Sequence, residues 1–140
     1  MNEKANILIV DDDASMCETL SDILEDKGYS VVIAQNGLRA VAEAGRRHFD
    51  LALIDIIMPG MNGVETLQGI KRVAPKTKTM IMTGHNAMEE PIYEALTAGV
   101  DRVLFKPFNV EGLVELISRE TGATTDYVDM PAVDFTKYQI

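Results

Sequence analysis

Two short apolar segments of this chain end in carboxylates. Ile7–Val10 leads directly into the acidic run Asp11–Asp13, and Leu51–Ile54 leads into Asp55. Open α/β sheets present their chemistry at the carboxyl ends of their strands, so these side chains are expected to meet in one pocket. Converging carboxylates repel one another unless a cation lies among them, and Mg²⁺ prefers such oxygen ligands. An aspartate can also attack phosphorus as a nucleophile and form an aspartyl phosphate.

Two further polar residues follow apolar segments in the same way. Thr83 ends Lys78–Thr83, and Lys106 follows Val103–Phe105. A phosphorylation site needs a hydroxyl or amide for one phosphoryl oxygen and a fixed cation for another. Each residue alone has an ordinary explanation, because Thr favours strands and a single Lys is usually a solvated surface charge. Their occurrence together with two acidic strand ends favours phosphoryl chemistry.

The segments that carry these residues alternate between two periodicities. Continuous apolar runs predict strands at Ile7–Val10, Val31–Ala34, Leu51–Asp55, Lys78–Thr83 and Val103–Phe105. Apolar residues at three- and four-residue spacing predict helices over Met16–Leu24, Leu38–Gly45, Val64–Val73 and Val110–Ile117, and a weaker one from about Glu90. This alternation predicts an α/β fold, a doubly wound five-stranded parallel sheet of order 2-1-3-4-5 in a flavodoxin-like three-layer sandwich.

Several helix ends carry recognisable signals. Asn62 with Glu65 predicts a capping box, and Asn109 predicts the cap of the last helix, which ends near Gly122. The first helix has two candidate caps, Asp13 and Ser15. Pro91 is tolerated only in a first turn, so the fourth helix is expected to start late, after a loop over 84–89. Cys17 lies on the apolar face of the first helix and is expected to pack as a small hydrophobic residue.

Composition limits the class of protein. The chain has 140 residues, 46% of them hydrophobic and 25% charged, which is typical of one globular domain. The net charge of −9 argues against direct nucleic-acid binding, because phosphate neutralisation needs clustered Lys and Arg. No apolar run approaches bilayer length, and one cysteine fits a reducing, cytoplasmic location. We expect a domain over residues 1–122 and a C-terminal tail, or the start of a linker, over 123–140.

The sequence resembles the receiver domain of two-component response regulators, of the chemotaxis-regulator type. The resemblance rests on IVDDD at 9–13, DIIMPGMNG at 55–63, MTG at 82–84 and KPF at 106–108. It implies that Asp55 accepts a phosphoryl group, and that Asp11, Asp12, Asp55 and the backbone carbonyl of Ile57 hold Mg²⁺. It also implies that Thr83 and Lys106 bind phosphoryl oxygens, and that the Lys106–Pro107 peptide is cis.

The resemblance implies partners as well. A histidine kinase or phosphotransfer protein would donate the phosphoryl group, and a downstream protein target or effector domain would respond. Whether phosphorylation produces a homodimer stays open. In most of the family an aromatic residue lies three positions before the lysine and moves with the threonine. This chain has Val103 there, which places that coupling in doubt but not phosphorylation itself.

The sequence leaves two other functions as alternatives. A receiver-like module that docks without phosphate fits Val103 but not the intact acidic cluster. A Mg²⁺-dependent aspartyl-phosphate hydrolase would need an acid/base near Asp55 and a lid, and the chain shows neither an inserted cap domain nor a second aspartate two residues after Asp55. We therefore expect a phosphoacceptor switch rather than an enzyme, apart from its own phosphorylation and dephosphorylation.

Overall fold

The computed structural model describes residues 5–56, 58, 60–83, 90–105 and 109–122. Its strands are β1 (Asn6–Val10), β2 (Ser30–Ala34), β3 (Leu51–Asp55), β4 (Lys78–Thr83) and β5 (Arg102–Phe105). They form one parallel sheet of order β2-β1-β3-β4-β5, which confirms the predicted topology. β1 and β3 are therefore central neighbours, and their carboxyl ends lie at the same edge of the sheet.

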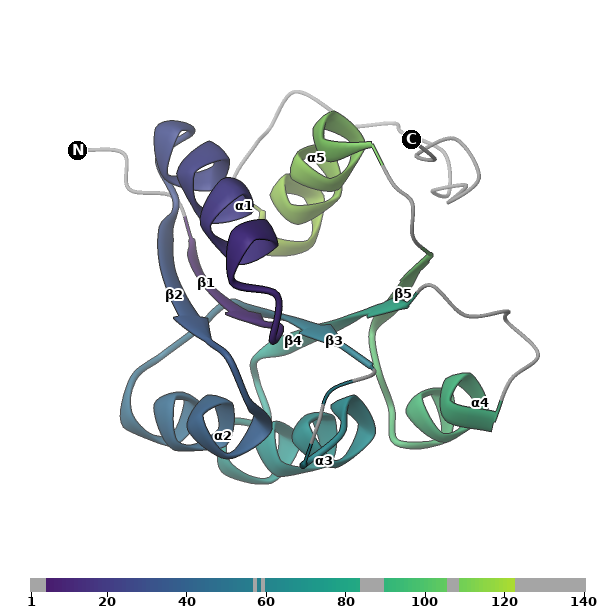
Figure 1. Ribbon diagram of the computed structural model, residues 1–140. Coiled ribbons are helices and arrows are strands. Elements are labelled where there is room, and N and C mark those ends of the chain that lie inside the picture. Colours follow the sequence, from purple (N-terminus) through teal and green to yellow (C-terminus); the bar gives the residue numbers. More distant parts are fainter. Residues whose placement is uncertain (1–4, 57, 59, 84–89, 106–108, 123–140) are drawn as a thin grey trace.

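Helices cover both faces of this sheet (Figure 1). They are α1 (Ala14–Asp26), α2 (Gly37–Arg46), α3 (Gly63–Val73), α4 (Glu90–Thr97) and α5 (Val110–Thr121). α1 and α5 lie on one face, whereas α2, α3 and α4 lie on the other. The fourth helix begins at Glu90 as predicted, while the loop expected before it lies outside the described residues. No described helix has both the length and the apolar character needed to span a bilayer.

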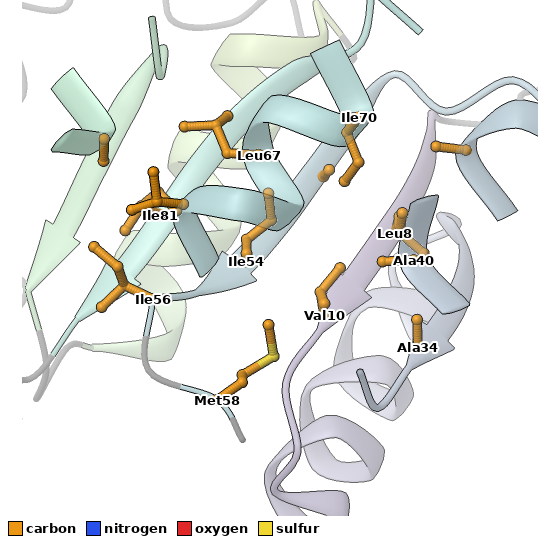
Figure 2. Close-up of a cluster of buried hydrophobic side chains, with 14 of the residues drawn as sticks. Leu8, Val10, Ala34, Ala40, Ile54, Ile56, Met58, Leu67, Ile70 and Ile81 are labelled. Carbon is orange, nitrogen blue, oxygen red and sulfur yellow. The ribbon is translucent and has the colours of Figure 1, made fainter. Parts of the chain in front are cut away.

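The core divides into two clusters, one on each face of the sheet. Leu8, Val10 and Ile54 point toward α2 and α3 and pack against Leu67 and Ile70 of α3 (Figure 2). The residues between them in the strands, such as Ile7, Ile9 and Leu53, belong to the second cluster under α1 and α5. Because successive strand residues point to opposite faces, strands covered on both sides must be apolar at every position. This explains the continuous apolar runs in the sequence.

Side-chain caps start the helices where the sequence predicts. Asn62 and Glu65 form a reciprocal capping box on α3, at 2.9 and 3.0 Å. Asn109 caps α5, and Gly122 ends it in the left-handed conformation. The choice left open for α1 falls on Asp13, whose carboxylate accepts a hydrogen bond from the Met16 amide at 3.1 Å. Ser15 is instead the second residue of that helix.

Three apolar residues on predicted helix faces are exposed. Leu38, Val73 and Leu96 retain 71%, 46% and 55% of their accessible surface. Leu38 lies between Gly37 and Ala40, which are buried, and Val73 is followed by Ala74, which packs against the core. Each exposed side chain therefore lies off the covered face of its helix. Leu96 neighbours Ala95, which is fully buried and takes the contact with the core. Periodicity identifies the apolar positions of a helix but not which of them face the core.

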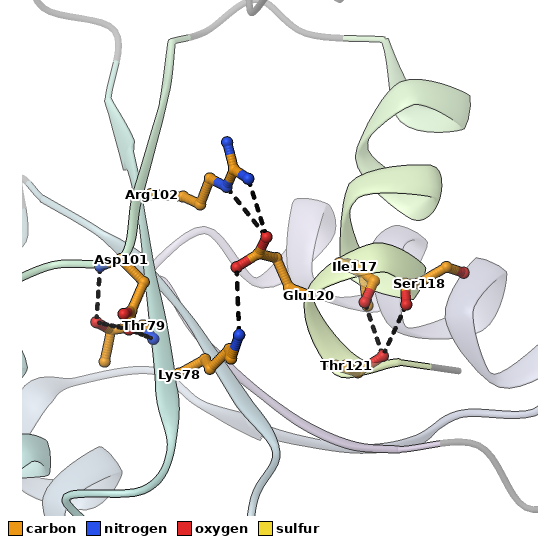
Figure 3. Close-up of polar contacts among 8 residues, drawn as sticks. All are labelled: Lys78, Thr79, Asp101, Arg102, Ile117, Ser118, Glu120 and Thr121. Atoms are coloured by element: carbon orange, nitrogen blue, oxygen red, sulfur yellow. Dashed lines mark hydrogen bonds and ion pairs between the residues drawn. The ribbon is translucent and has the colours of Figure 1, made fainter. Parts of the chain in front are cut away.

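Polar contacts fasten the amino ends of β4 and β5 to each other and to α5 (Figure 3). Arg102 donates to the carboxylate of Glu120 at 3.1 Å, and Lys78 lies 3.9 Å from the other oxygen of that carboxylate. Asp101 accepts hydrogen bonds from the amide of Thr79 at 2.8 Å and from its hydroxyl at 3.1 Å. Thr79 is fully buried, so the Asp101 carboxylate satisfies polar groups that water does not reach.

We expect Asp101→Ala to lower the free energy of unfolding by about 1–3 kcal/mol, because it removes the acceptor of these buried donors. Urea denaturation followed by circular dichroism measures this difference. Asp101→Asn keeps a side-chain oxygen in the same place, so its free energy of unfolding should fall by less. Equal stability of Asp101→Ala and the parent chain would show that the contact contributes nothing.

Candidate functional site

β1 and β3 bring two of the predicted aspartates to the same edge of the sheet. Val10 of β1 pairs with Ile54 of β3 in the parallel register, and Asp11 and Asp55 are the residues that directly follow this pair. The apolar runs that precede them are fully buried and hold both strands in the centre of the sheet. The position of each aspartate is therefore set by a strand rather than by a loop.

Asp11 is held firmly at the end of β1. Asp11 retains only 1% of its accessible surface. Its amide donates to the carbonyl of Ala34 at 3.2 Å, and its Oδ1 accepts a hydrogen bond from the Asp13 amide at 3.0 Å. The thiol of Cys17 donates to its backbone carbonyl at 3.4 Å. These contacts fix the backbone on both sides of the carboxylate.

Asp11, Asp12 and Asp55 form a carboxylate cluster. One oxygen from each lies within 4.8 Å of the other two. Asp11 and Asp55 are buried, at 1% and 9% exposure, whereas Asp12 is exposed. Three carboxylate oxygens with one side open to solvent suit Mg²⁺, which combines a few carboxylates with waters and phosphate oxygens. The donor set therefore fits the metal that the sequence predicts.

The turn after Asp55 depends on a close approach of two backbone segments. The Ile56 amide donates to the carbonyl of Met82, and the Gly63 amide donates to the carbonyl of Ile56 at 2.9 Å. A Cβ added to Gly63 would overlap the Cα of Ile56 and lie 2.5 Å from the carbonyl oxygen of Asp55. This close contact of Gly63 with the end of β3 emerges only from the structure.

The remaining predicted site residues follow the neighbouring strands. Thr83 ends β4, one residue after Met82, the register partner of Asp55, and it is fully buried. Its own register partner is Phe105, the last residue of β5. Lys106 comes next in the chain, but Lys106, Pro107 and Ile57 lie outside the described residues. The structure thus brings together the three aspartates and places Thr83 on the adjacent strand.

Val103 is part of the core. It is 9% exposed and packs in the cluster beneath α2, α3 and α4, with Phe105 partly buried against the same cluster. The two side chains share one face of β5, as their spacing predicts. A branched aliphatic residue thus fills the position at which the resemblance noted in the sequence implies an aromatic one.

Cys17 lies beneath the acidic cluster and is fully buried. Burial, as the largest cause, and the charges of Asp11, Asp13, Asp12 and Asp55 together raise the pKa of its thiol from the ordinary 9.0 to about 11. A thiol with a raised pKa stabilises the fold below pH 9.0, and that contribution is lost as the pH rises through about 11. The predicted role of Cys17 as a packing residue is confirmed.

We expect the native Cys17 thiol to react with Ellman's reagent at pH 8 in EDTA at least about 100-fold more slowly than in the unfolded chain, because the thiolate is the reactive form. Absorbance of the released thiol anion measures both rates. Urea exposes the same thiol and serves as the control. A native rate equal to the unfolded rate would contradict the burial of Cys17.

The sequence of this chain is similar to those of known proteins. The family model of the response regulator receiver domain matches residues 7–118 of the sequence. The transcriptional regulatory protein ZraR of Klebsiella oxytoca is 38% identical over 132 residues, which cover 94% of this chain and 29% of that protein. The ZraR of Salmonella typhimurium is 40% identical over 126 residues, which cover 86% of this chain and 28% of that protein. The chain therefore spans less than a third of the length of these relatives.

Solved structures agree. A CheY-like receiver domain protein from Methanospirillum hungatei superposes with a TM-score of 0.81 at 35% identity, covering 86% of this chain and 95% of that one. The receiver domain of the sensor histidine kinase PA1611 from Pseudomonas aeruginosa has a TM-score of 0.77 at 26% identity, covering 85% and 98%. That structure has a magnesium ion coordinated in its active-site cleft. With its parallel sheet, its acidic cluster and its match over residues 7–118, the chain belongs to the response regulator receiver domain family of two-component signalling.

Proposed function

We propose that this chain is a phosphoacceptor switch in which Asp55 takes a phosphoryl group from a phosphohistidine. The observation that carries the proposal is the carboxylate cluster, three acidic oxygens within 4.8 Å at the carboxyl ends of β1 and β3. A carboxylate oxygen of Asp55 forms a bond to phosphorus while the phosphorus–nitrogen bond of the donor breaks. The released imidazole keeps the electron pair of that bond and takes up a proton.

The residues around Asp55 have separate roles in this proposal. Asp11, Asp12, Asp55 and the carbonyl of Ile57 would hold Mg²⁺. When bound, Mg²⁺ would neutralise the charge that gathers between the carboxylates and the phosphoryl oxygens. Thr83 would donate its hydroxyl to one phosphoryl oxygen, and Lys106 would pair with another. The burial of Asp11 and Asp55 limits competition from water.

Partners follow from this chemistry. The donor would be a histidine kinase or a histidine phosphotransfer protein, and the chain would not turn over a substrate of its own. The phosphorylated form would change a protein-binding surface that is read by a target protein or an effector domain. We place the receiver domain at residues 1–122 and regard 123–140 as a tail or the start of a linker. The greater length of the ZraR relatives supports such a continuation.

Intact mass after incubation with acetyl phosphate and Mg²⁺ tests the proposal. We expect a gain of one phosphoryl group, which EDTA abolishes and which Asp55→Asn lacks. Asn keeps the size of the side chain but is not a nucleophile toward phosphorus. No adduct under any condition would contradict the switch.

Val103 supports a second candidate, a receiver-like module that docks onto its partner without phosphate. The observation is its burial in the core at the position where receiver domains usually carry a mobile aromatic residue. A partner that binds the parent chain and Asp55→Asn with equal affinity would favour this function over the switch.

A further inference from the structure

Three cationic side chains and a histidine gather at the amino-terminal edge of the sheet, opposite the carboxylate cluster. Arg46, Arg47 and His48 follow one another where α2 leads into β3, and Lys76 lies between α3 and β4. All four line one cavity of about 500 Å³. In a chain with a net charge of −9 this local concentration of positive charge stands out.

The cavity is part of a longer depression. An adjoining cavity of about 550 Å³ also has Arg47 and His48 in its lining and extends past the first residues of β1 and β2, Asn6 and Ser30. We call the two together the basic trough. Its floor beside Lys76 is made of small residues, Ala44, Gly45, Ala74 and Pro75. Two adjoining cavities that share Arg47 and His48 offer far more room than a compact ion needs, so together they suit an extended chain.

A buried carboxylate organises the trough. The side chain of Glu43 is 9% exposed and lies 3.5 Å from Arg46 and 3.5 Å from Arg47. Arg39 approaches the same carboxylate to 3.8 Å from the preceding turn of α2. One negative charge thus holds three guanidinium groups and leaves an excess of two positive charges. The arginine side chains remain 54–69% exposed, so their outer donors face solvent.

Ordinary helix electrostatics explains only part of this cluster. Arg46 lies in the last turn of α2, where the helix dipole favours a cation. Arg47 and His48 lie beyond the helical residues, and Lys76 belongs to a different connection. His48 Nε2 is 3.1 Å from Asp50 Oδ1, and Glu25 is the acidic residue in the lining of the adjoining cavity. The part near Lys76 therefore keeps its positive character.

We propose that the basic trough binds an extended acidic segment of a partner protein. Arg46, Arg47 and Lys76 would pair with carboxylates, and the small residues between them would take the peptide backbone or short side chains. Duplex nucleic acid fits less well, because its phosphates would extend beyond the three cations over a surface that is negative overall. The trough lies at the far edge of the sheet from Asp55, so its occupation does not depend on the proposed phosphorylation.

Fluorescence anisotropy with a labelled oligoglutamate peptide tests this inference on the full chain at low salt. We expect Arg47→Gln combined with Lys76→Gln to weaken binding by about tenfold. The matched control combines Lys71→Gln with Lys27→Gln, which removes the same amount of positive charge at residues that do not line the trough. The affinity of the control for the peptide should fall by less than about twofold. Salt at 1 M should abolish binding, because it shortens the electrostatic screening length to about 3 Å.

Three results would overturn the proposal. They are equal losses in the two double variants, absence of peptide binding in the parent chain, and tighter binding of a labelled DNA duplex than of the peptide. Self-association of the parent chain that disappears in Arg47→Gln/Lys76→Gln would identify a second copy as the occupant instead. Asp55→Asn should bind the peptide as the parent does, which separates this test from that of the phosphoacceptor.

Discussion

Replacing Gly63 by alanine is expected to cost about 2–3 kcal/mol of unfolding free energy, a value typical of overpacking in a close contact. The added methyl group would meet the backbone of Ile56 and Asp55, which cannot rotate away as the end of a flexible side chain can. The overlap is with the backbone at and directly after the end of β3, so relieving it is expected to displace Asp55. We therefore also expect phosphorylation by acetyl phosphate to slow by at least about tenfold, since nucleophiles depend on sub-ångström placement.

Gly45→Ala is the matched control for this substitution. Gly45 is also in a helix, α2, but an added Cβ would lie 3.9 Å from Val73, an ordinary contact distance. Because alanine favours helices by up to about 1 kcal/mol over glycine, this variant should be as stable as the parent or more so. Urea denaturation and the phosphorylation rate compare the two variants. Normal stability and rate in Gly63→Ala would contradict the close approach.

Removal of one carboxylate from the cluster is expected to lower the affinity for Mg²⁺ by about 100-fold, because a charged ligand is lost from a mostly buried site. Asp11→Asn tests this, since the amide oxygen of asparagine can still accept the hydrogen bond from the Asp13 amide. The backbone of the site should therefore stay in place. Calorimetric titration with MgCl₂ measures the affinity directly.

Asp13→Asn provides the control for charge alone. Asp13 belongs to the same acidic run but caps α1, and asparagine caps helices about as well as aspartate. Its affinity for Mg²⁺ should change by less than about threefold, as expected for an exposed charge outside the cluster. If Asp11→Asn and Asp13→Asn lower the affinity for Mg²⁺ equally, the metal is not bound where the carboxylates converge.

Much of the site is predictable because it is built on regular elements. The apolar run before Asp55 identifies a buried strand, and the order of alternating elements places that strand beside the one ending at Asp11. The carboxyl ends of parallel strands share an edge, so the convergence of Asp11, Asp12 and Asp55 follows from topology. The helix caps at Asn62 and Asn109 are equally local, since one side chain satisfies nearby amides.

Features that depend on long-range contact were not predictable. Leu38 and Val73 occupy apolar positions of their helices, but only the packed structure shows that their side chains lie off the covered faces. The spacing of Arg39, Arg46 and Arg47 predicts their ion pairs with Glu43, because side chains three and four residues apart meet on a helix. The burial of the Glu43 carboxylate, in contrast, depends on tertiary packing that this spacing does not reveal. The intolerance of Gly63 to a side chain arises from the backbone of Ile56, and sequence spacing carries no information about that distance.

Chemical location of the phosphoryl group tests the central claim most directly. Borohydride reduces an aspartyl phosphate to homoserine, so reduction after treatment with acetyl phosphate and Mg²⁺, followed by peptide mapping, identifies the residue that was modified. We predict homoserine at position 55, only when Mg²⁺ is present, and none at Asp11 or Asp12. Homoserine at either of those residues, or a phosphorylated chain with aspartate intact at 55, would contradict the assignment of Asp55 as the phosphoacceptor.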